Sequence, residues 1–182
     1  GVLQLGAADR VSDSSILTIA GGTLDLGGFS ETVGYLTLGG GSILNGTLNA
    51  GGYNLEAGTV VSSFTGSASL VKTSNGLVDL LGSSDYTGGT EIRGGTLRLG
   101  GNDRLPTAGA LILNGGSIDL NGYSQAASVV TLNAGTIANG VLVGGSYHLL
   151  WGDVTAILAG SGGLLKSGSL TVTLSGSNTY EG

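Results

Sequence analysis

The chain repeats itself with a period of 94 residues, and the two copies align without a gap. Residues 1–6, Gly-Val-Leu-Gln-Leu-Gly, return as residues 95–100, Gly-Thr-Leu-Arg-Leu-Gly, and about 35 of the 88 paired positions are identical. A long repeat of this kind indicates a stacked architecture in which each unit packs on its neighbours. It also argues against a unique catalytic site, because most of the side chains occur twice.

Within each copy, short runs of alternating apolar and polar residues end at glycine or Asn-Gly. Examples are Thr23–Leu26 before Gly27, and Tyr35–Leu38 before Gly39. Alternation with a period of two predicts strands with one buried face. Glycine and Asn-Gly provide the positive φ angles that tight corners require. No stretch has the apolar spacing of a helix, so we expect essentially no helix.

Short strands separated by sharp corners favour an all-β fold, a right-handed parallel β-helix. We expect about 20 to 24 residues per coil, so that each 94-residue copy makes about four coils and the chain about eight, stacked about 4.8 Å apart. The chain would then be one continuous body of two ungapped super-repeats, residues 1–94 and a truncated 95–182. An antiparallel β-sandwich is the alternative, but aromatic core residues and hairpin-type turns are few.

The composition excludes several classes of function. Of 182 residues, 38 are glycine and only 1 is proline, and the net charge is -6 with the basic residues scattered. A nucleic-acid binder would need a basic stripe, so that role is rejected. There is no cysteine for disulfides or thiolate metal sites. No apolar run approaches the roughly 20 residues of a transmembrane helix, so we expect no transmembrane segment.

We interpret the chain as a fragment of a longer protein, because it has no initiating methionine and stops partway through the second copy. Its partners would include neighbouring repeats of that parent chain. Solenoids normally need capping at their ends, and neither end of this sequence has an amphipathic cap. The terminal coils would therefore expose strand edges. We expect end-to-end self-association.

One segment in each copy resembles a known family. Residues 69–100 and 163–182 are similar to the autotransporter-associated β-strand repeat, also called the passenger-associated transport repeat. The first segment matches the pattern at Lys72, Gly82, Tyr86, Gly88, Gly89, Thr90, Ile92, Gly95, Leu97, Leu99 and Gly100, and the second at Lys166, Leu174, Gly176, Asn178, Thr179, Tyr180 and Gly182. The resemblance implies a secreted bacterial passenger with a right-handed β-helix, lying outside the outer membrane. It carries over no catalytic residues.

Two acidic motifs could support chemistry. Asp25 and Asp119 occupy equivalent outward strand positions, and paired carboxylates cleave glycosides. Four coils would put them about 20 Å apart, too far for that reaction. Residues 100–105, Gly-Gly-Asn-Asp-Arg-Leu, resemble a calcium-binding nonapeptide but lack tandem copies. We expect instead loop ion pairs within Asp9-Arg10 and Asp103-Arg104.

The residues that differ between the two copies are the best candidates for a functional site that occurs only once in the chain. His148 is the only histidine and Trp151 the only tryptophan; their counterparts are Asn54 and Ala57. Together with Tyr147 they form a candidate ligand patch where a sugar could stack. A slightly bulkier coil is the simpler explanation. Tyr86 and Tyr180 are interpreted as corner residues whose hydroxyls bond the backbone.

These observations predict a structural protein rather than an enzyme. The leading hypothesis is a non-catalytic stalk or spacer in an adhesin-like passenger at the bacterial surface or outside the cell, with no cofactor and no bound metal. A module that binds a polysaccharide or a host surface near the candidate ligand patch is the second hypothesis. A polysaccharide-cleaving β-helix enzyme is the third.

Overall fold

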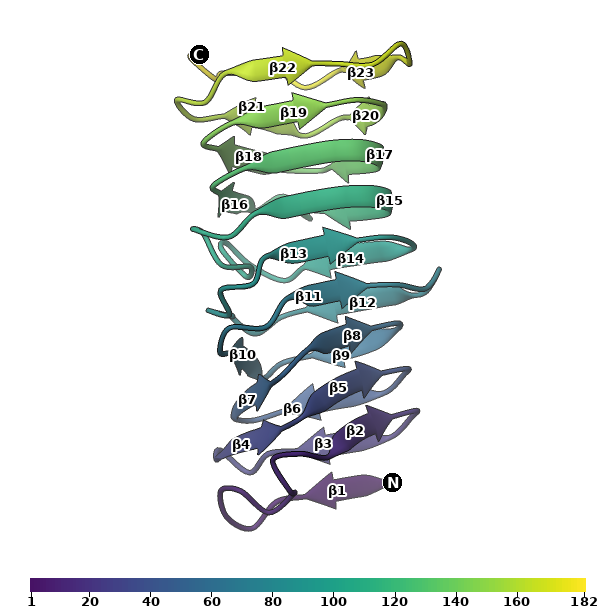
Figure 1. The fold of residues 1–182 in the computed structure, drawn as a ribbon, viewed down its shortest axis with the longest axis vertical. Coiled ribbons are helices and arrows are strands. Elements are labelled where there is room, and N and C mark those ends of the chain that lie inside the picture. The colour runs from purple at the N-terminus through teal and green to yellow at the C-terminus, as the bar shows by residue number, and fades with distance from the viewer.

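A computed structural model describes residues 1–182, and it is all-β, with 23 short strands and no helix. The paired strands are parallel, and successive coils stack from β1 (Val2–Gln4) at one end to β23 (Val172–Leu174) at the other (Figure 1). The prediction of an all-β parallel solenoid is therefore confirmed. Since there is no helix, none is long and apolar enough to cross a membrane.

Each coil contributes strands to two continuous faces and, in some coils, to a third. The first face contains β2 (Ile16–Ile19), β5 (Tyr35–Leu38), β8 (Tyr53–Leu55), β11 (Leu70–Lys72), β13 (Thr90–Ile92), the first parts of β15 (Leu111–Asp119) and β17 (Val130–Ala138), β19 (Tyr147–Leu149) and β22 (Leu164–Lys166). The second face contains β1, β3 (Thr23–Asp25), β6 (Ser42–Leu44), β9 (Gly58–Val60), β12 (Leu77–Leu80), β14 (Thr96–Leu99), the last parts of β15 and β17, β20 (Gly152–Val154) and β23.

The third face is interrupted. It consists of two separate three-stranded sheets, β4 (Ser30–Val33), β7 (Thr47–Ala50) and β10 (Ser63–Thr65) in the first copy, and β16 (Ser124–Ala127), β18 (Val141–Gly144) and β21 (Ile157–Ala159) in the second. Between them, loops replace the strands near residues 84–88 and 103–109. We call the level where the two copies meet, at β12 and β14, the seam.

The coils are shorter than predicted. Along the first face, eight successive pairings advance the chain by 19, 17, 17, 20 and 21 residues, which together equal the 94-residue period, and then by 19, 17 and 17. The solenoid therefore has about nine turns instead of eight, and the 94-residue period corresponds to five coils instead of four. The coil lengths recur in the same order, so the repeat in sequence is also a repeat of geometry.

The core lies between the faces as ladders of side chains that stack from coil to coil. On the second face, Leu24, Ile43 and Val60 occupy successive positions of one ladder and are fully buried. In all, 36 hydrophobic residues form one core. Burying a Leu or Val side chain contributes about 1.5–3 kcal/mol, and each ladder position contacts the coils above and below.

Two equivalent corners between the second and third faces use Asn-Gly. Asn45 has φ 53° and Gly46 φ 149°, and Asn139 and Gly140 repeat this geometry with φ 58° and 158°. Asparagine tolerates the left-handed conformation better than most residues. A Cβ atom on Gly46 would collide with the backbone of Phe29 in the coil below. The predicted role of these corners is confirmed.

Candidate functional site

The structure divides the candidate ligand patch, because Tyr147 points into the core. Its side chain is 0 % exposed. Its hydroxyl lies 2.7 Å from the carbonyl of Leu142 and 2.6 Å from that of Ala159, which share its single hydrogen, and it accepts from the amide of Gly144 (2.6 Å). Burial raises the pKa of this hydroxyl above its ordinary value. Tyr147 therefore braces the third face and cannot stack on a ligand, so its inclusion in the patch was wrong.

The other two members face solvent. His148 is exposed on the outer side of the first face, paired in register between Thr131 and Leu165. Trp151 is 50 % exposed in the turn between β19 and β20, and Leu165 is 55 % exposed. What remains of the patch is two exposed residues, His148 and Trp151, with Leu165 beside His148 in the strand register. Leu165 was missed because strand register alone brings it beside His148.

Asp25 and Asp119 are separated by five coils, or about 24 Å along the solenoid. The Asp25 carboxylate accepts hydrogen bonds from the amide of Gly27 (2.9 Å) and from Asn45 Nδ2 (3.1 Å). The first of these bonds is the main cause of a lowered pKa at Asp25. Asp119 accepts equivalent bonds from the amide of Asn121 (2.9 Å) and Asn139 Nδ2 (3.0 Å). Both carboxylates thus tie a corner to the next coil.

The acidic and basic neighbours in the loops do not form the expected ion pairs. The only salt bridges join Arg93 to Glu91 and Arg98 to Asp79. Arg10 instead donates to the carbonyl of Ala8 at 2.9 Å. Asp103 accepts a bond from the amide of Ala126 at 2.9 Å, and Arg104 donates to Ser83. The prediction of loop ion pairs at Asp9-Arg10 and Asp103-Arg104 was wrong. No group of three or more His, Asp or Glu side chains is arranged to hold a metal ion.

A buried lysine lies in the core of the first face, at a ladder position with apolar neighbours. Lys72 is 0 % exposed and occupies the ladder position between Leu55 and Ile92. Its ammonium donates to the carbonyls of Ser74 and Gly94, the latter at 3.2 Å. Burial lowers the pKa of Lys72, and the charge of Glu56 opposes that shift. In the first copy, the lysine of the resembled motif is thus a backbone-bonding core residue, whereas Lys166 of the second copy is exposed.

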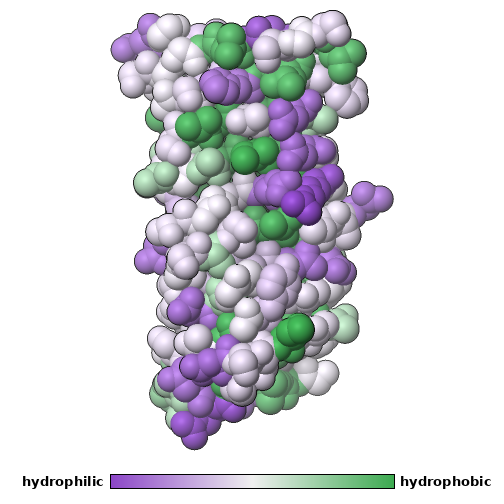
Figure 2. Space-filling view, viewed as in Figure 1, coloured by the Kyte–Doolittle hydropathy of each residue, from purple (hydrophilic) through white to green (hydrophobic).

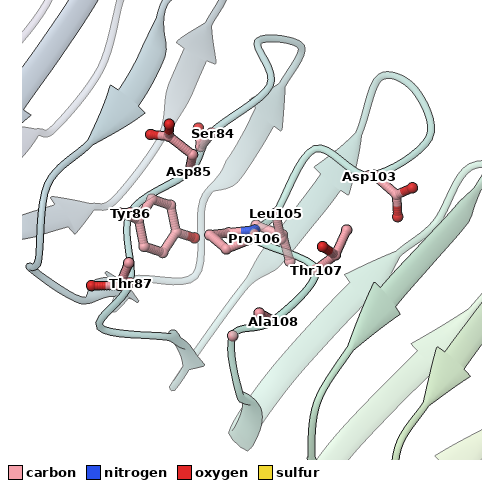
Figure 3. Close-up of a pocket in the computed structure, with 10 residues that line it drawn as sticks. Ser84, Asp85, Tyr86, Thr87, Asp103, Leu105, Pro106, Thr107 and Ala108 are labelled. Atoms are coloured by element: carbon pink, nitrogen blue, oxygen red, sulfur yellow. The ribbon is translucent and has the colours of Figure 1, made fainter.

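The largest surface hollow lies at the seam and measures about 300 Å³. It is lined by Ser84, Asp85, Tyr86, Thr87, Asp103, Leu105, Pro106, Thr107, Ala108 and Gly109. In Figure 3 the hydroxyl end of Tyr86 is directed toward Pro106, and Asp85 and Asp103 lie on opposite sides of the hollow. The hollow exists because loops replace the third-face strands at this level.

The hollow contains hydroxyls and carboxylates but no histidine or other base paired with a nucleophile. Tyr86 is fully buried, and its hydroxyl shares a 2.6 Å hydrogen bond with the Thr90 hydroxyl. The backbone bond predicted for Tyr86 was therefore wrong, whereas Tyr53 and Tyr147 make such bonds. Burial strongly raises the pKa of Tyr86. Tyr180, its counterpart, packs at the edge of the core with its ring 5.9 Å from that of Tyr147.

The outer walls show no large uninterrupted apolar surface in the view of Figure 2. Apolar side chains form small separate areas among hydrophilic ones, several of them toward the C-terminal end (Figure 2). Comparisons with models of protein families, with curated proteins and with solved structures found no match.

Proposed function

We propose that residues 1–182 form a non-catalytic stalk or spacer segment of a bacterial passenger of the autotransporter type, secreted or displayed at the cell surface. The resemblance of residues 69–100 and 163–182 to the passenger-associated repeat motivates the location. Neighbouring repeats of a longer parent chain would stack on the terminal coils. Length, rather than chemistry, would then be the property that this segment contributes.

The observation that carries the proposal is the use of polar side chains between coils. On the second face, Asp25 bonds Asn45 of the next coil, and Asp119 bonds Asn139 in the same way. On the first face, Asn114 bonds Asn133 at 2.6 Å, and Thr73 bonds Asn54 at 2.8 Å. Polar side chains that hydrogen-bond one coil to the next are less free to bind a substrate. Because these bonds recur along the solenoid, they are typical of a segment that acts as a rod.

A duplication tests the spacer role. An additional copy of residues 1–94, inserted between Gly94 and Gly95, should fold and lengthen the rod by five coils, about 24 Å. Small-angle X-ray scattering of the purified proteins measures this increase. The same protein with a shuffled 94-residue insert is the control. A duplicated protein that collapses or fails to lengthen would contradict the spacer role.

The location is tested with antibodies raised against residues 1–182. If the segment is displayed outside the outer membrane, intact and permeabilised source cells should label equally. For a secreted passenger, the antigen should accumulate in the culture medium. Labelling that appears only after permeabilisation, with none in the medium, would place the protein inside the cell and refute this part of the proposal.

The exposure of Trp151 favours a second candidate, a module that binds a polysaccharide or a host surface. Trp151 is 50 % exposed, three positions after His148 in the chain, and indole rings stack on sugars. Glycan-array binding that Trp151→Ala abolishes would support this function. Tyr123→Ala is the matched control, because Tyr123 is also partly exposed, at 38 %, on another part of the wall. Binding that survives Trp151→Ala, or no binding at all, would refute it.

The non-catalytic part of the proposal has its own test. The purified chain, incubated with a panel of acidic polysaccharides, should release no new reducing ends. If it does release them, the Asp85→Asn and Asp103→Asn variants would determine whether the hollow at the seam is responsible.

A further inference from the structure

The hollow at the seam lies where two neighbouring coils stop pairing. The amide of Ser84 donates to the carbonyl of Arg104 at 3.2 Å. Six residues later, the amide of Thr90 donates to the carbonyl of Ala110 at 2.9 Å. Between these two bonds no backbone hydrogen bond joins the two coils, and the hollow occupies this interval.

A turn in the later coil interrupts the pairing. Hydrogen bonds of a parallel ladder advance by two residues on each strand, so the bond after Ser84 to Arg104 would join the amide of Tyr86 to the carbonyl of Pro106. That carbonyl accepts instead from the amide of Gly109 at 3.0 Å. Pro106 also has no N–H group of its own to donate. The later coil therefore satisfies its own backbone and leaves that of the earlier coil without a partner.

The backbone of Tyr86 is unpaired on the side of the hollow. The amides of Asp85 and Thr87 donate to the preceding coil, at the carbonyls of Phe64 (3.0 Å) and Gly66 (2.9 Å). Successive residues of an extended segment direct their backbone groups to opposite neighbours, so the N–H and C=O of Tyr86 point toward the following coil. Neither group makes a hydrogen bond, and Tyr86 lines the hollow. One donor and one acceptor are thus available there to a ligand.

We propose that the hollow binds a short extended peptide that carries a lysine or arginine side chain. The backbone of such a peptide supplies the carbonyl and the N–H group that Tyr86 lacks, as does a strand added to the edge of a sheet. The volume of about 300 Å³ is at the lower end of the range for ligand sites, so only a few peptide residues would enter.

The charge of the hollow selects a basic side chain. Asp85 and Asp103 are exposed on opposite sides of it, and neither takes part in a salt bridge (Figure 3). No lysine, arginine or histidine is among the lining residues. Because a neutral or acidic glycan would gain nothing from two carboxylates, the hollow favours a cationic peptide over a glycan. The site is separate from Trp151, and the inference does not depend on where the protein acts.

The first experiment screens labelled residues 1–182 against immobilised pentapeptides, acetylated, amidated and random at every position, in about 0.15 M salt. We expect the bound sequences to be enriched in lysine and arginine over aspartate and glutamate by at least about tenfold. The strongest binder, made as a soluble fluorescent peptide, then gives dissociation constants by anisotropy. A screen without binders, or with binders that lack a basic residue, would overturn the proposal, as would a hollow that binds glycans alone.

A pair of charge reversals locates the site. Asp85→Lys should weaken binding of that peptide by at least about tenfold. Asp153→Lys is the matched control, because Asp153 is equally an exposed aspartate but lies on the outer side of β20, and it should change the affinity by less than about twofold. Equal weakening by the two variants would show attraction by overall charge and would refute the assignment to the hollow. Circular dichroism checks that both variants fold.

Hydrogen exchange of the unsubstituted chain, measured by NMR, tests the backbone contact without any variant. Saturation with the peptide should slow exchange of the Tyr86 amide by at least about tenfold, whereas the Thr87 amide, already bonded to Gly66, should change little. The same peptide methylated at every backbone nitrogen should not bind, because it has no N–H group to donate. Unchanged exchange at Tyr86, or full binding of the methylated peptide, would contradict the proposed pairing.

Discussion

Glu31 and Gln125 occupy equivalent positions in the two copies, but Glu31 only accepts hydrogen bonds, whereas Gln125 both accepts and donates them. Both are buried at the start of the third-face sheets, in β4 and β16. The Glu31 carboxylate accepts from the amides of Arg10 and Val11, both at 2.9 Å. The Gln125 side chain accepts from the amide of Leu105 and donates to its carbonyl, both at 3.0 Å. Each side chain replaces a missing strand partner for the loop of the preceding coil.

Exchanging these two residues should destabilise both sites. Glu31→Gln turns an amide donor toward a backbone N–H group, and we expect a loss of about 1–3 kcal/mol in the free energy of unfolding. Gln125→Glu places a carboxylate oxygen against the Leu105 carbonyl, and a buried charge without a partner should cost more, about 3–5 kcal/mol. Urea denaturation at neutral pH measures both changes.

The Gln125→Glu variant should also respond to acid. The carbonyl of Leu105 favours the protonated carboxyl, so the pKa of the new side chain would be higher in the folded protein than in the unfolded chain, where it is about 4.3. The lost stability should therefore return below about pH 4.3 and disappear again as the pH rises through the folded value. Glu31→Gln should show no such recovery. Wild-type stability of Gln125→Glu at neutral pH would contradict this account.

Removing the buried hydroxyl of Tyr53 or Tyr147 should weaken the third face. The Tyr53 hydroxyl shares its single hydrogen between the carbonyls of Leu48 and Thr65, at 2.8 and 2.6 Å, and accepts from the amide of Ala50. Tyr53→Phe leaves these buried groups without a partner, and we expect a loss of about 1–3 kcal/mol. Tyr35→Phe is the control, since Tyr35 is 39 % exposed, and should change stability by less than about 0.5 kcal/mol. Equal effects of the two substitutions in chemical denaturation would disprove the bracing role.

Stability should fall at alkaline pH. Burial raises the pKa values of Tyr53, Tyr86 and Tyr147 in the folded protein. Below the unfolded value of about 10, both states keep these protons, so the tyrosines add no pH dependence. Above it, the unfolded chain releases protons that the folded protein holds, and each tyrosine can lower stability by up to about 1.4 kcal/mol per pH unit.

Lys72 has the opposite effect on stability, because burial lowers its pKa in the folded protein. Its contribution makes stability rise with pH, and only below the unfolded pKa of about 10.4. Unfolding free energies measured between about pH 8 and pH 12 test the tyrosine effect. Tyr86→Phe should reduce the slope above about pH 10. An unchanged slope in that variant would show that Tyr86 does not contribute.

This fold needs glycine for two reasons, a positive φ angle and a lack of room for a Cβ atom. Substitutions at three glycines distinguish these reasons. Gly21 lacks a positive φ and has open space around it, so Gly21→Ala should be neutral or stabilise by about 0.4–1 kcal/mol. Gly28 has φ +85° with open space, so Gly28→Ala should cost about 1 kcal/mol through its backbone conformation. Gly41 has φ +83°, and a Cβ there would also collide with the carbonyl of Gly22 in the preceding coil. Gly41→Ala should therefore be the most damaging in thermal unfolding, and a different order would contradict this assignment.

The outcome at the candidate ligand patch shows where sequence reasoning succeeded and failed. His148 alternates with Tyr147 and Leu149, and this pattern correctly places the histidine outside. The same alternation places Tyr147 inside, which is inconsistent with a place in the candidate ligand patch. Lys72 was harder to predict, because in Leu70-Val71-Lys72 only the register with Leu55 and Ile92 decides that the lysine, and not the valine, is buried.

The sequence by itself determined the stacked all-β fold. Alternating residues, glycine corners and an ungapped period of 94 residues are compatible with few other ways of burying the apolar side chains. Only the tertiary structure decided that the period spans five coils, that the third face is interrupted at the seam, and which polar residues are buried. Those features depend on which strand pairs with which, and hydrogen bonding between coils sets that register through atoms that every residue shares.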